Sequence, residues 1–375
     1  MKAVTVQDGV LSVAEVPLPA PGPGQVRLRV TRAGICGSDL HVRVHAGASA
    51  DVAAEVGYPD FMRPGHRVVM GHEFTGVVDE YGPGCRRRWR PGQALVALPL
   101  IRHGHDVHMI GLSEHAPGAY AEYMLVAEDT AMPVPAGVSP DLAALTEPLA
   151  VARHAVGRGQ ISRRDTAVVI GCGPIGLATI LMLKAAGVRR IIAGDYAEGR
   201  RELARRCGAH LVVDPATASP WTGLASSITD VYGAGLDALH RLRGVPGLPW
   251  WLAVRAARRL ATAGVVVFEC VGVPGVLEDI VTHAPIRSRV VVVGVCMEPD
   301  TFRPAMAINK EIDLRFSFCY DPAEFRETLH LIAGGRVDPR PLITDVVGLD
   351  GVADAFDRLS KPGDHAKILV DPAQG

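Results

Sequence analysis

The chain contains 375 residues, a length typical of about two domains. Its 48% hydrophobic and 21% charged residues are ordinary for a globular protein and exclude global disorder. A net charge of −1 and only 5% aromatic residues argue against nucleic-acid binding, which usually requires a basic excess or aromatic stacking surfaces.

The cysteines and the apolar runs favour a cytoplasmic protein without a membrane segment. The seven cysteines are odd in number, widely spaced and free of any C-x-x-C pair, so we expect reduced thiols. Residues 1–16 alternate in polarity and predict a strand rather than a signal peptide. Residues 166–183 are uncharged and long enough to span a bilayer, but glycines and a proline interrupt them. We interpret this run as a buried strand, a tight turn and a buried helix.

The first 150 residues are rich in glycine, proline and short alternating runs. Strands are predicted at residues 26–30, 76–79 and 94–98, and Pro-Gly turn signals separate them. This pattern predicts a small β-barrel or sandwich.

The second part of the chain predicts a parallel sheet that helices cover on both faces. Short apolar runs alternate there with helical patterns such as residues 200–207 and 276–283, as in βαβ units. The expected strands are residues 166–170, 190–194, 210–213, 265–269 and 289–293, with a sixth at 312–318. The tail predicts helices at 323–333 and 352–359 and a last strand at 367–370. We expect this tail to return to the first domain.

One connection between two expected strands, residues 214–264, is unusually long. Residues 236–243 and 251–259 have helical, arginine-rich patterns. We interpret the segment as a surface insertion that buries Trp250 and Trp251 locally, since most insertions lie in loops. The alternative is a lid or an oligomer contact.

A glycine-rich turn between an expected strand and an expected helix predicts a dinucleotide site. This glycine turn consists of Gly171, Cys172, Gly173, Pro174, Ile175 and Gly176. Its glycines allow a tight turn and a close backbone approach to a pyrophosphate, which the helix N-terminus would bind. Asp195 ends the next expected strand, where its carboxylate can accept hydrogen bonds from both ribose hydroxyls. The alternative is a structural turn that binds nothing.

Side chains able to bind a metal gather in three short segments of the first domain. Residues 34–41 contain a cysteine, a serine, an aspartate and a histidine, residues 71–73 add His72 and Glu73, and Glu147 follows later. A thiolate, an imidazole and carboxylates make a plausible zinc shell, and three protein ligands with an open position are typical of a catalytic site. Each residue taken singly also has a purely structural interpretation.

These motifs resemble those of the zinc-containing medium-chain dehydrogenase/reductase family, nearest its sorbitol and threonine dehydrogenase branch. The matching segments are GICGSDLH at 34–41, GHEFTGVV at 71–78, EPLAVARHAV at 147–156, GCGPIGL at 171–177, FECVG at 268–272, VVVGV at 291–295, NKEIDL at 309–314 and PLIT at 341–344. They occur in family order and cover nearly the whole chain.

The resemblance implies an α/β protein with a GroES-like β-barrel catalytic domain and a Rossmann domain with a doubly wound parallel sheet. The implied catalytic domain covers residues 1–151 and is completed by residues 318–375. The Rossmann domain covers residues 152–317 and carries an insertion around residues 216–260.

The resemblance also implies a catalytic zinc on Cys36 and His72, with either Glu73 or Glu147 as a further ligand. Asp39 would orient the ring of His72 from outside the metal shell. From the residues alone, the choice between the two glutamates stays open.

Two residues near the expected metal match a proton relay. Ser38 corresponds to the hydroxyl that contacts the substrate oxygen, and His41 to the outer end of the relay. The implied cofactor-binding residues are Gly171, Gly173, Pro174, Ile175, Gly176, Asp195 and Arg200. The implied cofactors are Zn²⁺ and NAD.

The implied reaction is hydride transfer between NAD(H) and a secondary alcohol, polyol or sugar, or the matching ketone. Asp195 predicts NAD, whereas Arg200 and Arg201 would suit the 2′-phosphate of NADP. The alternatives are a zinc-free NADP-dependent reductase on the same fold and a catalytically silent dinucleotide-binding protein. No motif identifies the substrate. The family also implies a homodimer or homotetramer.

The chain departs from the family where many members hold a second, structural zinc on four cysteines. Residues 101–108 contain no cysteine but include His103, His105 and His108, and His115 follows. We therefore predict one zinc per chain and interpret these residues as a solvated loop. A histidine site in place of the cysteines is the alternative.

Overall fold

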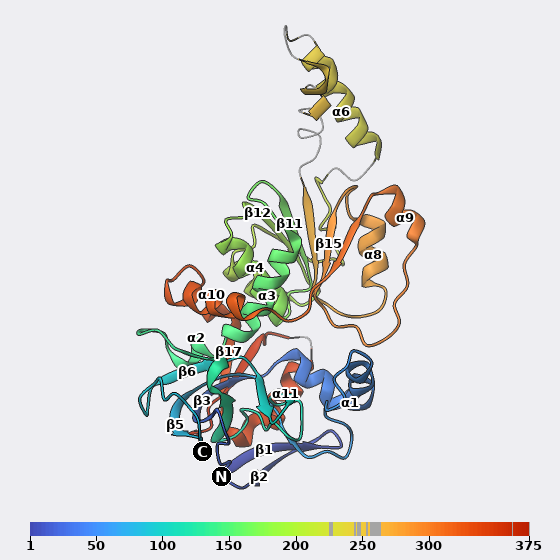
Figure 1. Ribbon diagram of the computed structural model, residues 1–375. Coiled ribbons are helices and arrows are strands. Elements are labelled where there is room, and N and C mark those ends of the chain that lie inside the picture. The colour runs from blue at the N-terminus through green and yellow to red at the C-terminus, as the bar shows by residue number, and fades with distance from the viewer. Residues whose placement is uncertain are drawn as a thin grey trace. The chain divides into compact units, whose positions relative to one another are not determined.

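The computed structural model describes residues 1–224, 228–243, 245, 249–252, 254–255, 264–361 and 363–374. Contacts divide the chain into two compact units (Figure 1). Unit 1 comprises Met1–Arg153 and Cys319–Gly375, and unit 2 comprises His154–Phe318.

Unit 1 opens with an antiparallel hairpin of β1 (Lys2–Gln7) and β2 (Val10–Glu15), and β1 also pairs with β4 (Val68–Val69). The prediction of one strand over residues 1–16 is therefore wrong. Asp8 and Gly9 both have positive φ angles, of 50° and 77°, as a two-residue hairpin turn requires.

The main sheet of unit 1 has the strand order β10-β6-β5-β3-β18-β17, and β9 also pairs with β3. Its strands are β3 (Gln25–Gly34), β5 (Glu73–Tyr81), β6 (Ala94–Ala97), β9 (Tyr123–Ala127), β10 (Ala131–Pro133), β17 (Ile343–Val347) and β18 (Lys367–Val370). The last strand, β18, lies beside β3, so the chain's tail completes this sheet. Leu28, Phe74 and Phe356 belong to the core that the sheet covers.

The other elements of unit 1 surround this sheet. They are α1 (Gly37–Glu55), the hairpin of β7 (Leu100–His103) and β8 (Asp106–Met109), α2 (Pro140–Ala143), the first residues of α3 (Thr146–Gly159), α10 (Pro322–Ala333), α11 (Val352–Leu359) and short 3₁₀ turns at Glu128–Thr130, Arg340–Leu342 and Leu349–Gly351. The predicted tail helices correspond to α10 and α11.

Unit 2 contains a six-stranded parallel sheet in the order β13-β12-β11-β14-β15-β16. Its strands are β11 (Thr166–Ile170), β12 (Arg190–Gly194), β13 (Leu211–Val213), β14 (Val265–Glu269), β15 (Arg289–Val292) and β16 (Asp313–Phe316). Numbered from the first strand of the unit, this is the 3-2-1-4-5-6 order of a Rossmann fold. The predicted fold class is confirmed.

The helices of unit 2 include α4 (Pro174–Ala185), α5 (Glu198–Cys207), α6 (Ile228–Arg243), α8 (Val276–His283) and α9 (Pro304–Asn309). The apolar run at residues 166–183 is β11, the glycine turn and α4, which confirms its interpretation. Among the described residues, no helix has both the length and the apolar character that crossing a bilayer requires.

The long connection contains α6, and the pattern at residues 236–243 is its second half. Most of residues 251–259 lie outside the described part of the chain. The prediction that this segment buries Trp250 and Trp251 is wrong, since they are 68% and 61% exposed. Trp221, near the start of the connection, is the tryptophan that packs into the core of unit 2.

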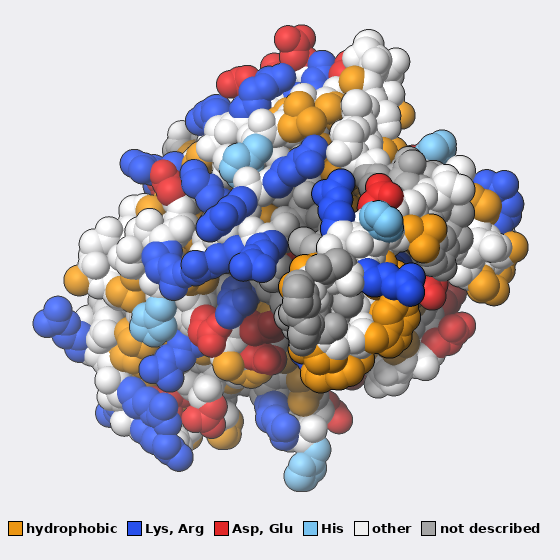
Figure 2. Space-filling view, turned by 90° about the horizontal axis from the view of Figure 1, so that it is seen from above, with side chains coloured by type: hydrophobic (Ala, Val, Ile, Leu, Met, Phe, Trp, Pro, Cys, Tyr) orange, Lys and Arg blue, Asp and Glu red, His pale blue; other side chains and the backbone are white. Residues whose placement is uncertain are grey.

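Basic side chains gather on the face of the molecule shown in Figure 2. Unit 2 has exposed arginines before or at the start of β11 and β12 and in the last turn of α5: Arg163, Arg164, Arg189, Arg190, Arg205 and Arg206. Positive charge in the last turn of a helix offsets the negative end of its dipole. Although the chain is nearly neutral overall, its basic side chains are unevenly distributed over the surface.

Candidate metal centre and cofactor site

The end of β3 and the start of α1 place the first candidate ligand. Cys36 is the N-cap residue of α1, in extended conformation, and it forms a capping box with Asp39. The backbone N–H of Cys36 donates to Oδ2 of Asp39 at 3.0 Å. This local structure holds Cys36, Ser38 and Asp39 within one helical turn. The sequence reasoning did not predict α1.

Three candidate ligands meet beside this helix start. One ligand atom each of Cys36, His72 and Glu73 lies within 4.8 Å of the other two. Pairing of β3 with β5 sets Gly34 opposite Glu73, and a Cβ on Gly34 would overlap the Glu73 carboxylate. A thiolate, an imidazole and a carboxylate form a donor set that suits zinc. We call these three residues the ligand group.

His72 lies between two of the predicted polar partners. Its Nε2 is 3.3 Å from the Ser38 hydroxyl, and its Nδ1 is 3.3 Å from Oδ1 of Asp39. Both Nδ1 and Oδ1 are buried without a well-aligned hydrogen bond. Nε2 thus faces the Ser38 side of the ring, where it could bind a metal in place of this contact, and Nδ1 faces the carboxylate, as expected if Asp39 orients the ring.

Burial and neighbouring charges have opposite effects on the pKa values of His72 and Asp39. Burial alone would lower the pKa of His72, but Asp39 and Cys36 raise it well above its ordinary value. Burial would raise the pKa of Asp39, but His72 and hydrogen bonds that include one from the Tyr120 hydroxyl, at 2.6 Å, lower it. An anion-rich site of this kind attracts a cation, and a bound metal would displace the proton of His72.

A buried ion pair flanks the ligand group and was missed by the sequence reasoning. The ammonium of Lys367, at the start of β18, lies 2.6 and 2.8 Å from the two oxygens of Glu73 and donates to the Ile35 carbonyl at 3.0 Å. Lys367 is 1% exposed and Glu73 is 0% exposed. The available signal was a lysine heading an otherwise apolar strand, because a buried lysine almost always has an anionic partner.

Glu147 stands outside the ligand group. It lies in the first turn of α3, and it forms a hydrogen bond with the Tyr320 side chain. Burial, together with the charge of Glu73, raises the pKa of Glu147 to about 7, against the lowering effect of His72. Of the four predicted metal ligands, the structure therefore brings three together and places the fourth in their electrostatic field.

His41 lies one turn beyond Ser38 on α1, on the same side of the helix, and is exposed. Partial burial, together with the charge of His45, lowers the pKa of His41. A neutral, solvent-accessible imidazole at this position can take up a proton and release it to water.

The glycine turn of unit 2 joins β11 to α4 as predicted. Gly171 has φ of 90°, a conformation that side chains rarely adopt, and a Cβ on Gly176 would overlap the Gly171 carbonyl. Gly173, the N-cap of α4, has open space where a Cβ would lie, and Pro174 starts the helix. The turn thus presents the helix N-terminus to open space, as a bound pyrophosphate requires.

The carboxylate of Asp195 lies directly beside this turn. Its Oδ2 accepts a hydrogen bond from the Cys172 N–H at 2.8 Å, and its Oδ1 accepts one from the Ala197 N–H at 2.8 Å. Arg201 donates to the carbonyls of Asp195 and Tyr196 and pairs with Asp214 at 3.2 Å. By contrast, Nε of Arg200 is buried without a hydrogen-bond partner. The two arginines that sequence reasoning left as alternatives thus differ in how far they are already engaged.

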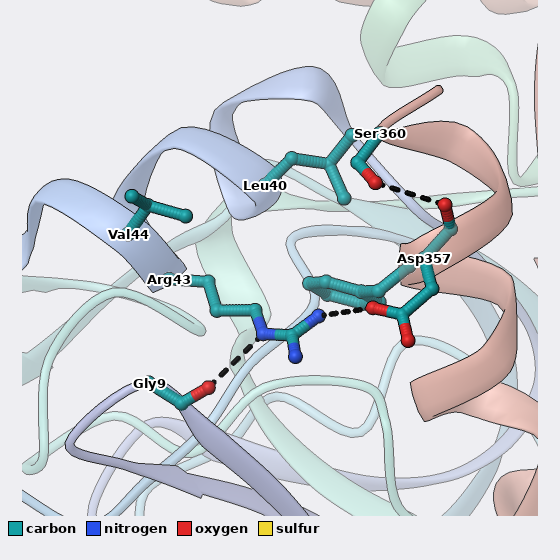
Figure 3. Close-up of a pocket in the computed structure, with 7 residues that line it drawn as sticks. Gly9, Leu40, Arg43, Val44, Asp357 and Ser360 are labelled. Carbon is teal, nitrogen blue, oxygen red and sulfur yellow. Dashed lines mark hydrogen bonds and ion pairs between the residues drawn. The ribbon is translucent and has the colours of Figure 1, made fainter.

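A surface pocket of about 380 Å³ lies between the β1–β2 turn, α1 and α11 (Figure 3). Arg43 crosses it, donating to the Gly9 carbonyl and to Asp357, both at 3.0 Å. None of the predicted site residues lines this pocket. The guanidinium of Arg43 is already paired with Asp357. Because the pocket also lacks the predicted site residues, we do not take it as the candidate active site.

The prediction of a solvated loop at residues 101–108 is right about exposure and wrong about the loop. These residues belong to the β7–β8 hairpin, in which residues 102–107 are exposed. His108 is only 5% exposed, and Ile101, its cross-strand partner, packs into the core of unit 1.

Comparison with known proteins agrees with this architecture. Residues 22–136 match the alcohol dehydrogenase GroES-like domain, and residues 253–334 match the zinc-binding dehydrogenase domain. These matches, with the Rossmann sheet and the ligand group, define an oxidoreductase of the zinc-binding dehydrogenase class. The chain belongs to the zinc-containing medium-chain dehydrogenase/reductase family, as its motifs predicted.

Similar proteins extend over nearly the whole chain. It is 30% identical to the (R,R)-butanediol dehydrogenase of Bacillus subtilis, over 96% of each chain. An alcohol dehydrogenase structure from Escherichia coli complexed with NADH is 25% identical, with a TM-score of 0.75 and 99% of both chains covered. A zinc-binding dehydrogenase structure from Sinorhizobium meliloti bound to NADP is 28% identical, with a TM-score of 0.77 and 99% of both chains covered. Sorbitol and L-threonine dehydrogenases are also among the relatives.

Proposed function

We propose that the protein is a zinc-dependent, NAD-preferring dehydrogenase. It would oxidise a secondary alcohol, polyol or sugar, or reduce the matching ketone in the reverse direction. The observation that carries this proposal is the ligand group, whose three donor atoms converge within 4.8 Å in unit 1. The glycine turn and Asp195 in unit 2 support the second half of the proposal, the dinucleotide.

Cys36, His72 and Glu73 would hold the metal. When bound, zinc supplies a Lewis acid that lowers the pKa of a substrate hydroxyl. Glu73 is favoured over Glu147 as the third ligand, because its carboxylate lies within the ligand group and that of Glu147 does not. Lys367 would limit how tightly Glu73 binds the metal, since the same carboxylate oxygens already accept two ammonium hydrogen bonds.

Ser38 would take the first proton step. Its hydroxyl lies 3.3 Å from Nε2 of His72, so a substrate hydroxyl at the ligand group would be within hydrogen-bond reach of it. His41, exposed one turn further along α1, would pass the proton to solvent. Asp39 would keep the His72 ring oriented through the 3.3 Å contact with Nδ1.

The preference for NAD rests on Asp195. Each of its oxygens accepts one backbone hydrogen bond and keeps a lone pair for a ribose hydroxyl. Its negative charge would repel a 2′-phosphate. The rival is an NADP-dependent enzyme, which the unpartnered Nε of Arg200 and the NADP complex of the Sinorhizobium relative support.

The decisive experiment is a screen of secondary alcohols, polyols and their ketones with NAD and with NADP, read as nicotinamide absorbance. The purified protein is assayed with its metal, after chelation, and after zinc is restored. Turnover that is lost with the metal and returns with zinc supports the proposal. Turnover that survives complete metal removal would show a zinc-free reductase, and tight NAD binding without turnover on any substrate would favour a silent protein.

The family further supports a homodimer or homotetramer that works in the cytoplasm. Sedimentation equilibrium of the purified chain tests the first point, and fractionation of the source cells tests the second.

A further inference from the structure

Seven exposed cations lie along one edge of the parallel sheet in unit 2. The strands β11 and β12 both begin at this edge, and α4 and α5 end near it, because a crossover must return there before the next parallel strand. The Arg163 side chain lies beside Gly187, which follows α4, and the Lys184 side chain lies beside Gly208, which follows α5. We call Lys184 and six arginines the arginine edge: Arg163, Arg164, Arg189, Arg190, Arg205 and Arg206.

The positive charge of the arginine edge is almost entirely unneutralised. Among the described residues, the one carboxylate that pairs with any of its side chains is that of Glu202, 2.9 Å from Arg205. Asp165, at the start of β11, already pairs with Arg289 at 2.7 Å. Cations in the last turns of α4 and α5 offset the helix dipoles, but the four arginines that precede or begin strands have no such role.

The insertion between β13 and β14 joins unit 2 at this same edge. Before α6, Gly223 lies beside the Arg190 guanidinium. After the insertion, the Gly264 carbonyl accepts a hydrogen bond from the Thr166 N–H at 2.9 Å, where β11 and β14 begin. Both ends of the insertion are therefore next to the arginine edge.

The described residues of the insertion expose large apolar side chains to water. Leu236 on α6 is 67% exposed, Trp250 and Trp251 are exposed to a similar extent, and Val245 and Val254 are also exposed. Apolar side chains grouped with arginines in one exposed segment are typical of an interaction surface. Three exposed arginines lie among them: Arg241, Arg243 and Arg255.

An anionic lipid surface suits both features. Its headgroups offer negative charge without a fixed spacing, and tryptophan prefers the boundary between headgroups and hydrocarbon. A nucleic acid would neutralise the arginines but would leave Leu236 and the two valines in water. A second copy that docked symmetrically through this face would bring two arginine edges together, and their like charges would repel.

We propose that the arginine edge and the insertion of unit 2 bind the protein to the surface of an anionic lipid bilayer. The arginine edge attracts the headgroups, and Leu236, Trp250 and Trp251 enter the boundary layer. The association is peripheral, since no described helix has the length and apolar character to cross a bilayer. The glycine turn follows the opposite end of β11, so this binding requires neither NAD nor zinc and leaves the turn uncovered.

The test is co-sedimentation of the full-length protein with vesicles of phosphatidylcholine, either alone or mixed with phosphatidylglycerol. The protein should sediment with the mixed vesicles only. Salt should weaken the association, because the Debye length falls from about 10 Å at 0.1 M to about 3 Å at 1 M. Replacing Arg164, Arg189 and Arg206 by glutamine should weaken binding about fivefold for each charge removed, as expected for single cations near an anionic surface.

The matched control removes the same number of exposed arginines from unit 1. The variant Arg86→Gln/Arg87→Gln/Arg90→Gln should bind the mixed vesicles as the wild type does. Turnover of both triple variants should stay unchanged, since none of these residues belongs to the ligand group or the glycine turn.

The two tryptophans are tested separately. Their fluorescence emission should shift to shorter wavelength on the mixed vesicles, because the rings leave water. Trp250→Ala/Trp251→Ala should weaken vesicle binding at least about tenfold, since each ring loses a large buried area. Trp250→Phe/Trp251→Phe should retain most of the binding and lose most of the emission shift. Melting temperatures should stay unchanged, because both side chains are exposed.

The proposal is overturned if the wild-type protein does not sediment with the mixed vesicles, or if the unit 1 variant loses as much binding as the arginine-edge variant. It is also overturned if Trp250→Ala/Trp251→Ala binds vesicles as the wild type does. A DNA duplex that binds the arginine edge while the vesicles do not would assign the surface to nucleic acid. A dimer that dissociates in that tryptophan variant, with vesicle binding unchanged, would assign it to a second copy.

Discussion

The ligand group and the glycine turn are built in opposite ways. The glycine turn comprises six consecutive residues, and its geometry follows from backbone conformation and from the lack of Cβ atoms. The ligand group takes residues from the start of α1 and the start of β5, and Lys367 from the last strand joins it. One site depends on local shape, and the other depends on side chains that only the folded sheet brings together.

This difference decides how each site responds to substitution. A metal centre of buried charges is sensitive to any change in charge, because each ion is stabilised only by its partner. A backbone cradle is sensitive to added volume, because its ligand approaches the main chain directly. Substitutions in each region should therefore affect one ligand and spare the other.

The largest effect is expected from removing a proposed metal ligand. Cys36→Ser and His72→Ala should abolish turnover while leaving NAD binding nearly intact, because the glycine turn belongs to the other unit. Steady-state rates measure the first effect, and the rise in melting temperature on adding NAD measures the second. Substantial turnover in both variants would contradict a zinc-based mechanism.

The next effect concerns the buried pair of Lys367 and Glu73 at the proposed metal centre. Lys367→Met leaves the fully buried Glu73 without its counter-ion, and breaking such a pair typically costs about 3–5 kcal/mol. Urea unfolding of the metal-free protein measures this loss. The double variant Lys367→Met/Glu73→Gln removes both charges and should recover much of the stability. If the single and double variants are equally unstable, the loss comes from packing rather than from charge.

The two regions also differ in how far the sequence could predict them. The glycine turn, β11, β12 and Asp195 follow from a local pattern, and their predicted bounds match the structure. For the ligand group, the residue types were predictable, but their convergence depends on the register of β3 with β5. No local pattern contains that register.

The residues that were missed or misplaced share this dependence on distant contacts. Lys367 stands out in the sequence only as a lysine at the head of an apolar strand, and its partner Glu73 becomes evident only when β18 pairs with β3. His108 was predicted in a solvated loop but is buried. The burial of one face of the hairpin depends on what that face packs against, and no local pattern contains this contact. Glu147 resembles a metal ligand in its motif, yet its side chain bonds Tyr320, which is far along the chain.

A third prediction tests the carboxylate of Asp195, the charged group beside the glycine turn. The wild-type enzyme should prefer NAD, since Asp195 would face a 2′-phosphate as a like charge. Two such charges 4 Å apart repel by about 4 kcal/mol at an effective dielectric of 20. Screening reduces this repulsion. We therefore expect kcat/KM to be roughly one to three decades higher with NAD than with NADP, at about 1.4 kcal/mol per decade.

Kinetics with both cofactors on one substrate, repeated for Asp195→Ala, measure that preference. The variant should lose most of the discrimination between NAD and NADP. An additional Arg200→Ala substitution should then weaken NADP binding. Equal or better kcat/KM with NADP in the wild type would show that Arg200 outweighs the carboxylate.

The smallest expected effect separates shape from charge within the glycine turn. A Cβ on Gly176 would overlap the Gly171 carbonyl, so Gly176→Ala forces the turn and α4 apart, and overpacking of this kind costs about 1–3 kcal/mol. Gly173→Ala meets no protein atom within 4 Å and should fold as the wild type does. Its methyl group would nevertheless occupy the space beside the helix N-terminus, so NAD affinity should fall while stability stays unchanged. Urea unfolding and NAD titration of both variants distinguish these cases, with zinc content as the control that should not move. If Gly173→Ala binds NAD as tightly as the wild type, the pyrophosphate does not lie against this turn, and the contrast between a backbone site and a side-chain site fails.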